Sequence, residues 1–370
     1  MAARLLWVYD SITDAFKAPF SVALDNDYYS DLQKRYRAFF DGCRDAGADE
    51  LSLKIIDKYS RKVLEALREY YSGRVSSAHM IIKNLVKGCL SDGLAISSVT
   101  GCHAFSGATD EIQFFRARCG TPQGFAAHDM LHLPYSKRSL TGSYRFSIPG
   151  VPSLYLANSS YGCWIELGQP SDHDFNVSPV LVDGDLKILN LAVMDRDFGA
   201  LIEFEADAVH SWLKLLVLMV ATSYHIEEPD RNFKSEYIVS QSIMLACQEL
   251  GLDGIAYYSK RVGNQVFARA AINLALISKY KHRQEYGDVC KHIKVGDSFN
   301  YFMFRQLGGT YGQADYDLRC LQNPYVNNIG ASIGSFERQY SYSLTNFCDF
   351  DKFLFAGWKD KDQIEWGNAL

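Results

Sequence analysis

The sequence predicts an α+β protein, in which helices come first and short strands and helices mix afterwards. Between residues 25 and 90, apolar side chains recur every three or four positions, as they do on one face of a helix. No proline stands between Pro19 and Pro122, so long helices are permitted in this part. Beyond it, turn residues separate short apolar runs, without the regular strand–helix rhythm of a doubly wound sheet.

The elements of the mixed part are predicted from short apolar runs and the turn residues around them. We expect strands at 112–118, 153–157, 255–258 and 266–278, and helices at 207–224 and 236–250. Gly251 closes the second helix, and a Gly263-Asn264 turn joins the last two strands. Prolines and glycines between the first two strands indicate loops there.

The length of the chain and the changes in its sequence pattern divide it into three parts. With 370 residues, it exceeds one ordinary domain. We expect an all-helical N-terminal domain at 1–104, a mixed domain at 105–280 and a C-terminal extension or cap at 281–370. The last part is rich in Phe, Tyr, Gly and Asn but is not low in complexity, so we expect it to be ordered.

Composition limits the classes of function. A hydrophobic share of 48% with 22% charged residues is typical of a folded soluble protein, and the net charge of −5 disfavours nucleic acid as a partner. The longest apolar run, Trp212–Thr222, is broken by Lys214 and falls short of the roughly 20 residues that span a bilayer. Nine scattered cysteines without a Cys-x-x-Cys pair, and a start without a secretory signal, indicate a cytoplasmic protein with reduced thiols.

Two histidines, His128 and His132, have the spacing of a zinc-binding helix. The metalloprotease pattern needs Glu beside the first histidine, but Asp129 stands there in this chain. Pro134 also ends any helix directly after the second histidine. We therefore expect no metal at this position or elsewhere in the protein.

Short motifs with chemically useful side chains follow one another in the mixed part. They are Phe114-Phe115-Arg116-Ala117-Arg118, Met130-Leu131-His132-Leu133-Pro134, the run from Tyr144-Arg145 to Leu154-Tyr155-Leu156, Cys163-Trp164-Ile165-Glu166-Leu167, and Gly254-Ile255-Ala256-Tyr257-Tyr258-Ser259. In order, spacing and residue type, residues 113–278 resemble the RES family of bacterial toxins, named for an Arg, a Glu and a Ser. The resemblance implies an ADP-ribosyltransferase-like split β-sheet with flanking helices, and the consumption of NAD⁺.

The resemblance also implies roles for individual residues. Arg116 and Arg145 correspond to two arginines of the family, and Tyr155 to the tyrosine that lines its nicotinamide pocket. Glu166 corresponds to the glutamate on the following helix, and Ser259 to the serine. Arg116, Glu166 and Ser259 are thus expected to be catalytic. Shorter members carry Gly-Arg-x-Asn-Pro where this chain has Tyr-Arg-Phe-Ser-Ile-Pro, which leaves the geometry of this loop and its substrate selectivity open.

The chemistry of NAD⁺ cleavage calls for these residue types. Breaking the N-glycosidic bond builds positive charge on the ribose, which a carboxylate such as Glu166 stabilises. The diphosphate needs charged and preferably bidentate donors, a role for Arg116, Arg145 and Arg138. Longer family members carry a similar His-x-Pro segment, so His132 is also placed at the NAD⁺ site, with a structural role as the alternative. No step needs a metal.

We therefore expect an enzyme that cleaves the nicotinamide–ribose bond of NAD⁺. It is a glycohydrolase if water is the acceptor and a phosphorylase if inorganic phosphate is a co-substrate. By family analogy, it fits a toxin of a toxin–antitoxin or antiphage system, because draining NAD⁺ arrests growth. An antitoxin or other regulatory protein is the expected partner, and a homo-oligomer is also open. Protein ADP-ribosylation at the same site is the first alternative, because the acceptor leaves no mark in the sequence.

A different class of function would be centred on the N-terminal helices. Arg74 and His79 have the Arg-x4-His spacing of HEPN-type ribonucleases, whose helical domains resemble this region. In that alternative, the helical domain is an RNase or an interaction module, and the RES-like part is a nucleotide sensor. Two residues at this spacing are frequent by chance, so a sensing or dimerisation module is the favoured interpretation of these helices.

Overall fold

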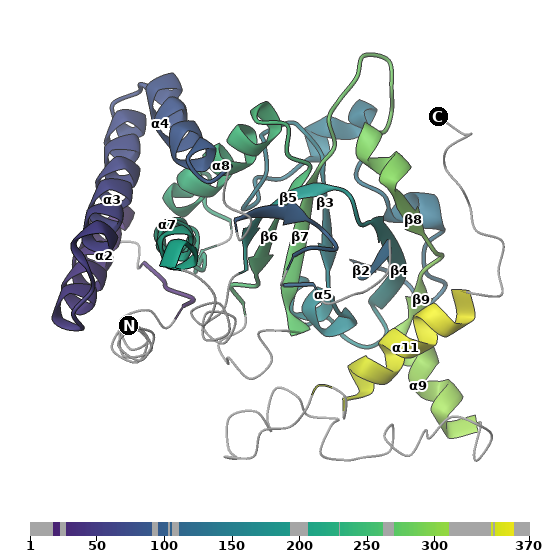
Figure 1. Ribbon diagram of the computed structural model, residues 1–370. Helices are drawn as coiled ribbons and strands as arrows, with labels where there is room; N and C mark the ends of the chain where they lie inside the picture. The colour runs from purple at the N-terminus through teal and green to yellow at the C-terminus, as the bar shows by residue number, and fades with distance from the viewer. Residues whose placement is uncertain are drawn as a thin grey trace.

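The fold is a mixed sheet with helices on its faces, preceded by a group of long helices (Figure 1). The computed structural model describes residues 18–22, 27–90, 95–102, 104–105, 111–192, 206–228, 230–261, 270–310, 342 and 345–358. The prediction of an α+β protein with N-terminal helices is confirmed. Within the described residues, no helix is both long and apolar enough to cross a bilayer.

The N-terminal part consists of α2 (Tyr28–Asp45), α3 (Glu50–Tyr71) and α4 (Val75–Lys87), which confirms the helices predicted between residues 25 and 90. Two of them begin at a capping aspartate. Asp27 accepts from the backbone N–H groups of the first turn of α2, and Asp49 does so for α3. Each helix turns an apolar stripe inward, as the three- and four-residue spacing predicts.

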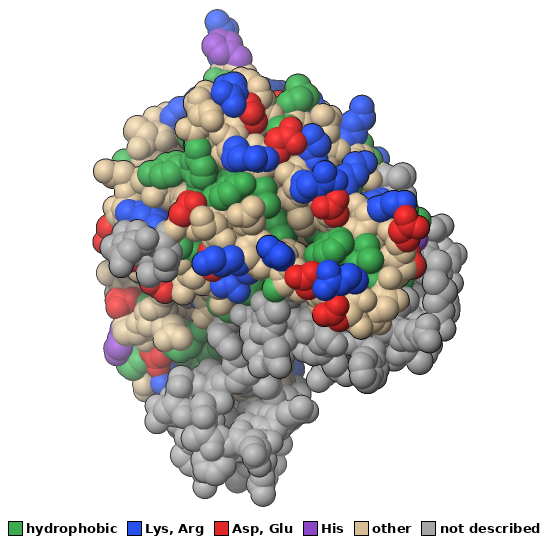
Figure 2. Space-filling view, turned by 90° about the vertical axis from the view of Figure 1, so that its left-hand side faces the viewer, with side chains coloured by type: hydrophobic (Ala, Val, Ile, Leu, Met, Phe, Trp, Pro, Cys, Tyr) green, Lys and Arg blue, Asp and Glu red, His purple; other side chains and the backbone are tan. Residues whose placement is uncertain are grey.

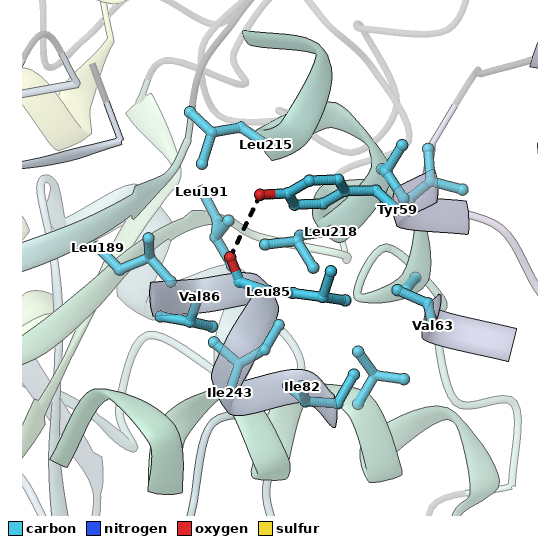
Figure 3. Packing of buried hydrophobic residues seen from close by; sticks show 14 of the residues in the cluster. Tyr59, Val63, Ile82, Leu85, Val86, Leu189, Leu191, Leu215, Leu218 and Ile243 are labelled. Atoms are coloured by element: carbon cyan, nitrogen blue, oxygen red, sulfur yellow. Dashed lines mark hydrogen bonds between the residues drawn. The ribbon is translucent and has the colours of Figure 1, made fainter. Parts of the chain in front are cut away.

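The apolar face of these helices is buried against the rest of the protein. Figure 3 shows side chains of α3 and α4 packed with others from strand β5 (Lys187–Leu191) and from the helices α7 (Ala206–Ala221) and α8 (Ile238–Glu249). Tyr59, Val63, Ile82, Leu85, Val86, Leu189, Leu191, Leu215, Leu218 and Ile243 belong to this cluster. The N-terminal helices thus share one core with the sheet. The boundary at 104/105 remains a prediction.

Within the described residues, the sheet has nine strands. They are β1 (Ile96–Ser98), β2 (Glu111–Cys119), β3 (Ser153–Ala157), β4 (Phe175–Asp183), β5, β6 (Gly254–Tyr258), β7 (Ile272–Ile277), β8 (Ile293–Val295) and β9 (Phe299–Asn300). The order is β1-β5-β6-β7-β3-β2-β4-β8, with β9 also on β4. β5 and β6 are parallel and the other pairs antiparallel.

The sheet is nearly divided between β2 and β3. β2 pairs with β4 along its whole length, but it meets β3 at a single position, where Phe115 lies opposite Ala157. β3 in turn pairs with β7 along its whole length. Beyond Phe115 the two strands separate, so their edges are free to line an opening. This is the split expected from the resemblance.

Most predicted elements of this part are present. The strands at 112–118, 153–157 and 255–258 correspond to β2, β3 and β6, and the helices at 207–224 and 236–250 to α7 and α8. The strand at 266–278 is present as β7, while its first four residues and the Gly263-Asn264 turn lie outside the described residues. β4 and β5 were not predicted.

The described C-terminal elements cover the sheet beside β4. Helices α9 (Tyr301–Thr310) and α11 (Asn346–Trp358) form an aromatic cluster with the short helix α5 (Ser160–Glu166). The cluster includes Tyr161, Trp164, Phe175, Tyr301, Phe304, Phe347 and Phe350. Asp351 of α11 accepts from the backbone N–H of Ser160, at 3.0 Å, and from the hydroxyl of Tyr342, at 2.6 Å. The C-terminal part therefore fixes the start of α5.

Candidate active site

A cavity of about 560 Å³ opens where β2 and β3 separate. Its walls come from β2, β3, the loop between residues 133 and 152, the end of α5, the segment after α7 and the residues after β6. This volume is in the range of small-molecule sites. Of the seven residues predicted for the NAD⁺ site, four line the cavity, namely Arg116, Arg145, Tyr155 and Glu166.

Arg116 bridges the split in the sheet. Its Nη1 donates to the backbone carbonyl of Tyr155 on the facing strand, at 3.0 Å. Its Nε is buried without a hydrogen-bond partner, and no carboxylate pairs with the guanidinium in the described part of the chain. Desolvation and the charge of Arg118 lower the pKa of Arg116 to about 10. The guanidinium is still a cation at neutral pH, so it is a site for an anionic group.

Glu166 supplies the one carboxylate among the described residues that line the cavity. It is the last residue of α5, and Oε1 accepts from Nδ2 of Asn273 on β7, at 2.6 Å. Oε2 lies 3.9 Å from Nε of Arg261. The side chain keeps 36% of its surface exposed. Glu166 is thus an oriented carboxylate, and a positive charge that develops in the cavity would be stabilised by it.

Aromatic rings form one wall of the cavity. Tyr155 donates its hydroxyl to the carbonyl of Phe146, at 3.0 Å, and its ring meets that of Tyr144 edge to face. Tyr237 and Tyr257 also line the cavity. Burial raises the pKa of Tyr155 and Tyr257, so both remain neutral. Such a wall fits a flat heteroaromatic ring such as nicotinamide.

Part of the chain is similar to a known protein family. Residues 114–294 match the family model of the RES domain. The chain contains a RES domain. A Bacillus subtilis (strain 168) protein named "Putative toxin YopC" is 27% identical over 234 residues, which are 59% of this chain and 51% of that protein. The chain thus spans about half the length of this curated relative.

Among solved structures, the RES-containing chain is similar to a chain of the M. tuberculosis MbcT–MbcA toxin–antitoxin complex. The sequences are 13% identical, and the TM-score is 0.31. The match covers 61% of this chain and 96% of the other.

Arg145 of the RES domain is held by the end of α7. Its Nη1 and Nη2 donate to the backbone carbonyls of Thr222 and Tyr224, which follow the last turn of that helix, and the guanidinium lies 5.3 Å from the ring centre of Tyr237. An arginine at a helix C-terminus satisfies free carbonyls and complements the helix dipole. Its predicted contact with the diphosphate remains a prediction.

His132 is not among the residues that line the cavity, although it bonds to Leu133, which is one of them. Gly287 N–H donates to Nε2, at 2.9 Å, and Nδ1 donates to the carbonyl of Leu133. A Cβ at Gly287 would lie 1.6 Å from the carbonyl oxygen of Ser278, so only glycine fits this approach. Burial lowers the pKa of His132, which keeps the ring neutral. These contacts favour the structural alternative for His132.

Arg138 and Ser259 are not among the residues that line the cavity either. Nε of Arg138 donates to the carbonyl of Tyr135, and the guanidinium lies 4.9 Å from the ring centre of Tyr280. Ser259 is buried, and its Oγ accepts from the backbone N–H of Arg261, at 3.2 Å. Ser259 therefore orders the segment that brings Arg261 beside Glu166. Direct ligand contacts of these two residues remain predictions.

Several residues of the cavity were missed in the sequence. Asn273 interrupts an otherwise apolar strand, which is a visible signal for a buried hydrogen bond. Lys260 and Arg261 directly follow the predicted Ser259, and both line the cavity. His225 also lines it, and burial together with nearby arginines lowers its pKa. Within the described part of the chain, no group of His, Cys, Asp and Glu side chains is arranged to hold a metal ion.

The Arg74 and His79 pair does not form a joint site. Arg74 is exposed and pairs with Glu69, at 2.6 Å. His79 faces α8 instead, with Nδ1 3.1 Å from Oγ of Ser242 and Nε2 3.2 Å from a carboxylate oxygen of Glu249. Figure 2, which views the side of the N-terminal helices, shows basic and acidic side chains interspersed rather than one basic patch. A ribonuclease needs both side chains free to act on a phosphate, so these contacts favour the interaction-module interpretation.

Proposed function

We propose that the RES domain binds NAD⁺ in this cavity and cleaves its nicotinamide–ribose bond. One observation carries the proposal. Among the described residues at the split between β2 and β3, the cavity combines an arginine without a carboxylate partner, a single oriented carboxylate and a wall of tyrosines. NAD⁺ offers a matching group to each, since it has a diphosphate, a ribose that becomes positive during cleavage, and a nicotinamide ring.

The proposed reaction uses these three pairs of matching groups. Arg116 holds the diphosphate, and the tyrosine wall packs the nicotinamide ring. As the glycosidic bond breaks, its electron pair moves to the ring nitrogen, and nicotinamide leaves as a neutral molecule. The ribose then carries positive charge, which Glu166 stabilises. An acceptor oxygen then bonds to the ribose carbon that nicotinamide has left. Water, which loses a proton to the solvent, gives ADP-ribose, and inorganic phosphate gives ADP-ribose-1″-phosphate.

The biological role that we propose is that of a toxin whose target is the NAD⁺ pool. The relative from Bacillus subtilis carries the name "Putative toxin YopC", and NAD⁺ depletion would arrest growth. An antitoxin or another regulatory protein is then needed to restrain the activity, and self-assembly is a second means of restraint. Protein ADP-ribosylation is the alternative, since an amino-acid side chain as acceptor would use the same cavity.

Expression in bacterial cells separates the RES cavity from the N-terminal helices. The wild-type chain should deplete cellular NAD⁺ and stop growth, Glu166→Gln should do neither, and His79→Ala should act like wild type while RNA stays intact. The reason is that Glu166 lies in the cavity, whereas His79 is engaged with α8. If Glu166→Gln still arrests growth with NAD⁺ unchanged, while His79→Ala is harmless, the N-terminal helices are the active part.

A further inference from the structure

The cavity is lined by more basic side chains than are needed to balance the negative charge of the NAD⁺ diphosphate. Among the described residues, one carboxylate, that of Glu166, lines it together with six basic side chains, which are Arg116, Arg118, Arg145, Lys234, Lys260 and Arg261. The contacts of these cations differ. Arg145 is held by two carbonyls, and Arg261 lies beside Glu166. Lys260 stands apart from them, because it is buried and still unbonded.

Lys260 follows Ser259 directly after β6, and the residue is buried, with 8% of its surface exposed. Within the described part of the chain, it has neither a hydrogen-bond nor an ion-pair partner. Lysine is almost never buried without a partner, because an ammonium group loses its hydration there. A buried amine that lines a ligand cavity and has no partner of its own is a binding group for the ligand.

We propose that Lys260 binds the diphosphate of the nucleotide and takes up a proton when the nucleotide enters the cavity. This inference rests on the proposed function, because it takes the diphosphate of NAD⁺ as the ligand. Together with Arg116, it gives the diphosphate a second cation in the place of Arg138, which does not line the cavity. Where the amine is neutral before binding, it would become an ammonium group paired with phosphate oxygens.

Burial and nearby charges determine how readily the amine of Lys260 holds a proton before a ligand binds. Desolvation and the neighbouring charge of Arg145 disfavour its ammonium form, and Glu166 favours it. The pKa of Lys260 is lowered to about 7 as a result. A diphosphate adds negative charge beside the amine and raises this pKa again. His225 also lines the cavity, but its pKa is lowered from an ordinary value that is already below that of lysine, so it titrates in a more acidic range.

The sign of the pH dependence follows from this linkage. Below about pH 7, Lys260 already carries its proton, so the affinity for the diphosphate does not depend on pH. Above about pH 7, one proton must be taken up on binding, so the affinity falls about tenfold per pH unit until the pKa of the complex is reached. An arginine-only site would show no such slope.

The test uses the full-length protein and ADP-ribose, whose diphosphate keeps its charge over this pH range. Calorimetric titrations from about pH 6 to about pH 9, in two buffers with different heats of ionisation, give the affinity and the protons bound. We expect uptake of about one proton near pH 8 and a tenfold loss of affinity per unit above about pH 7. A flat affinity without proton uptake, or no binding of ADP-ribose, would overturn the proposal.

Three variants identify the residue. Lys260→Arg keeps a permanent charge, so it should bind without the slope, and Lys260→Met should bind weakly at every pH. The matched control is Lys234→Met, which removes another lysine of the cavity and should leave the slope intact. A slope that persists in folded Lys260→Met protein assigns the proton to another group and contradicts the inference.

The proposed function is tested separately in the same preparation. Release of nicotinamide from NAD⁺ by the wild-type protein supports bond cleavage whatever the calorimetry shows. If nicotinamide is released but ADP-ribose binding is independent of pH, the role of Lys260 alone is wrong. If ADP-ribose binds with the expected slope and NAD⁺ stays intact, the cavity is a nucleotide-binding site and the cleavage reaction is wrong.

Discussion

Replacement of Glu166 by Gln should lower kcat for NAD⁺ cleavage by about 100-fold or more, with a much smaller change in KM. Gln retains an oxygen that accepts from Asn273, so the substitution removes the charge and keeps the hydrogen bond. The lost charge acts mainly on the transition state, in which the ribose is positive. Steady-state kinetics of nicotinamide release measures both constants.

The control for this substitution is Glu285→Gln, which makes the same chemical change at an exposed glutamate that contacts Ser136 and does not line the cavity. It should have the kcat of the wild type. A folded Glu166→Gln protein with nearly normal kcat would exclude this residue as the carboxylate that stabilises the ribose. A pure rise in KM would assign it to substrate binding instead.

Arg116→Lys should weaken NAD⁺ binding by roughly 10- to 100-fold although the charge is kept. Lysine lacks the planar fork, so it cannot both bridge to the carbonyl of Tyr155 and hold a phosphate. It would also leave the two edges of the split sheet without their link. Equilibrium binding of NAD⁺ to an Arg116→Lys protein checked by thermal unfolding measures the effect.

Arg37→Lys is the matched control, because Arg37 lies on α2 with 87% of its side chain exposed. Its affinity should equal that of the wild type. The assignment of Arg116 fails if its lysine variant binds and turns over NAD⁺ normally. If Arg116→Lys impairs folding but the folded fraction keeps its affinity for NAD⁺, the role of Arg116 is limited to the bridge between the two strands.

The fold was predictable where a local pattern determines the element. The strand at 153–157 has the predicted bounds, and the N-terminal helices follow their apolar spacing and aspartate caps. β4 could not be predicted because Pro179 stands in its middle, and proline normally argues against a central strand. On one side, β4 meets β8 at residues 180–182 and β9 at residues 176–177. Pro179 lies between the residues that pair with these two short strands. Its lack of a backbone N–H therefore costs no hydrogen bond of the sheet there.

The candidate site was predictable only where its residues stand in local sequence motifs. Arg116, Tyr155 and Glu166 stand in motifs, so a resemblance could point to them. The separation of β2 from β3 after Phe115 depends on pairing between distant segments, and no local pattern carries it. The positions of Asn273 and Lys260 at the cavity depend on the same pairing between distant segments. Their signals were a polar residue in an apolar strand and a lysine beside a predicted serine.

The central claim is that the RES domain breaks the nicotinamide–ribose bond. Its most direct test is to incubate purified full-length protein with NAD⁺, with and without inorganic phosphate, and to identify the products by mass. We expect free nicotinamide together with ADP-ribose, or with ADP-ribose-1″-phosphate when phosphate is the acceptor. An increase in protein mass by ADP-ribose would instead support the transferase alternative. NAD⁺ that remains intact with folded protein under both conditions would contradict cleavage by this cavity.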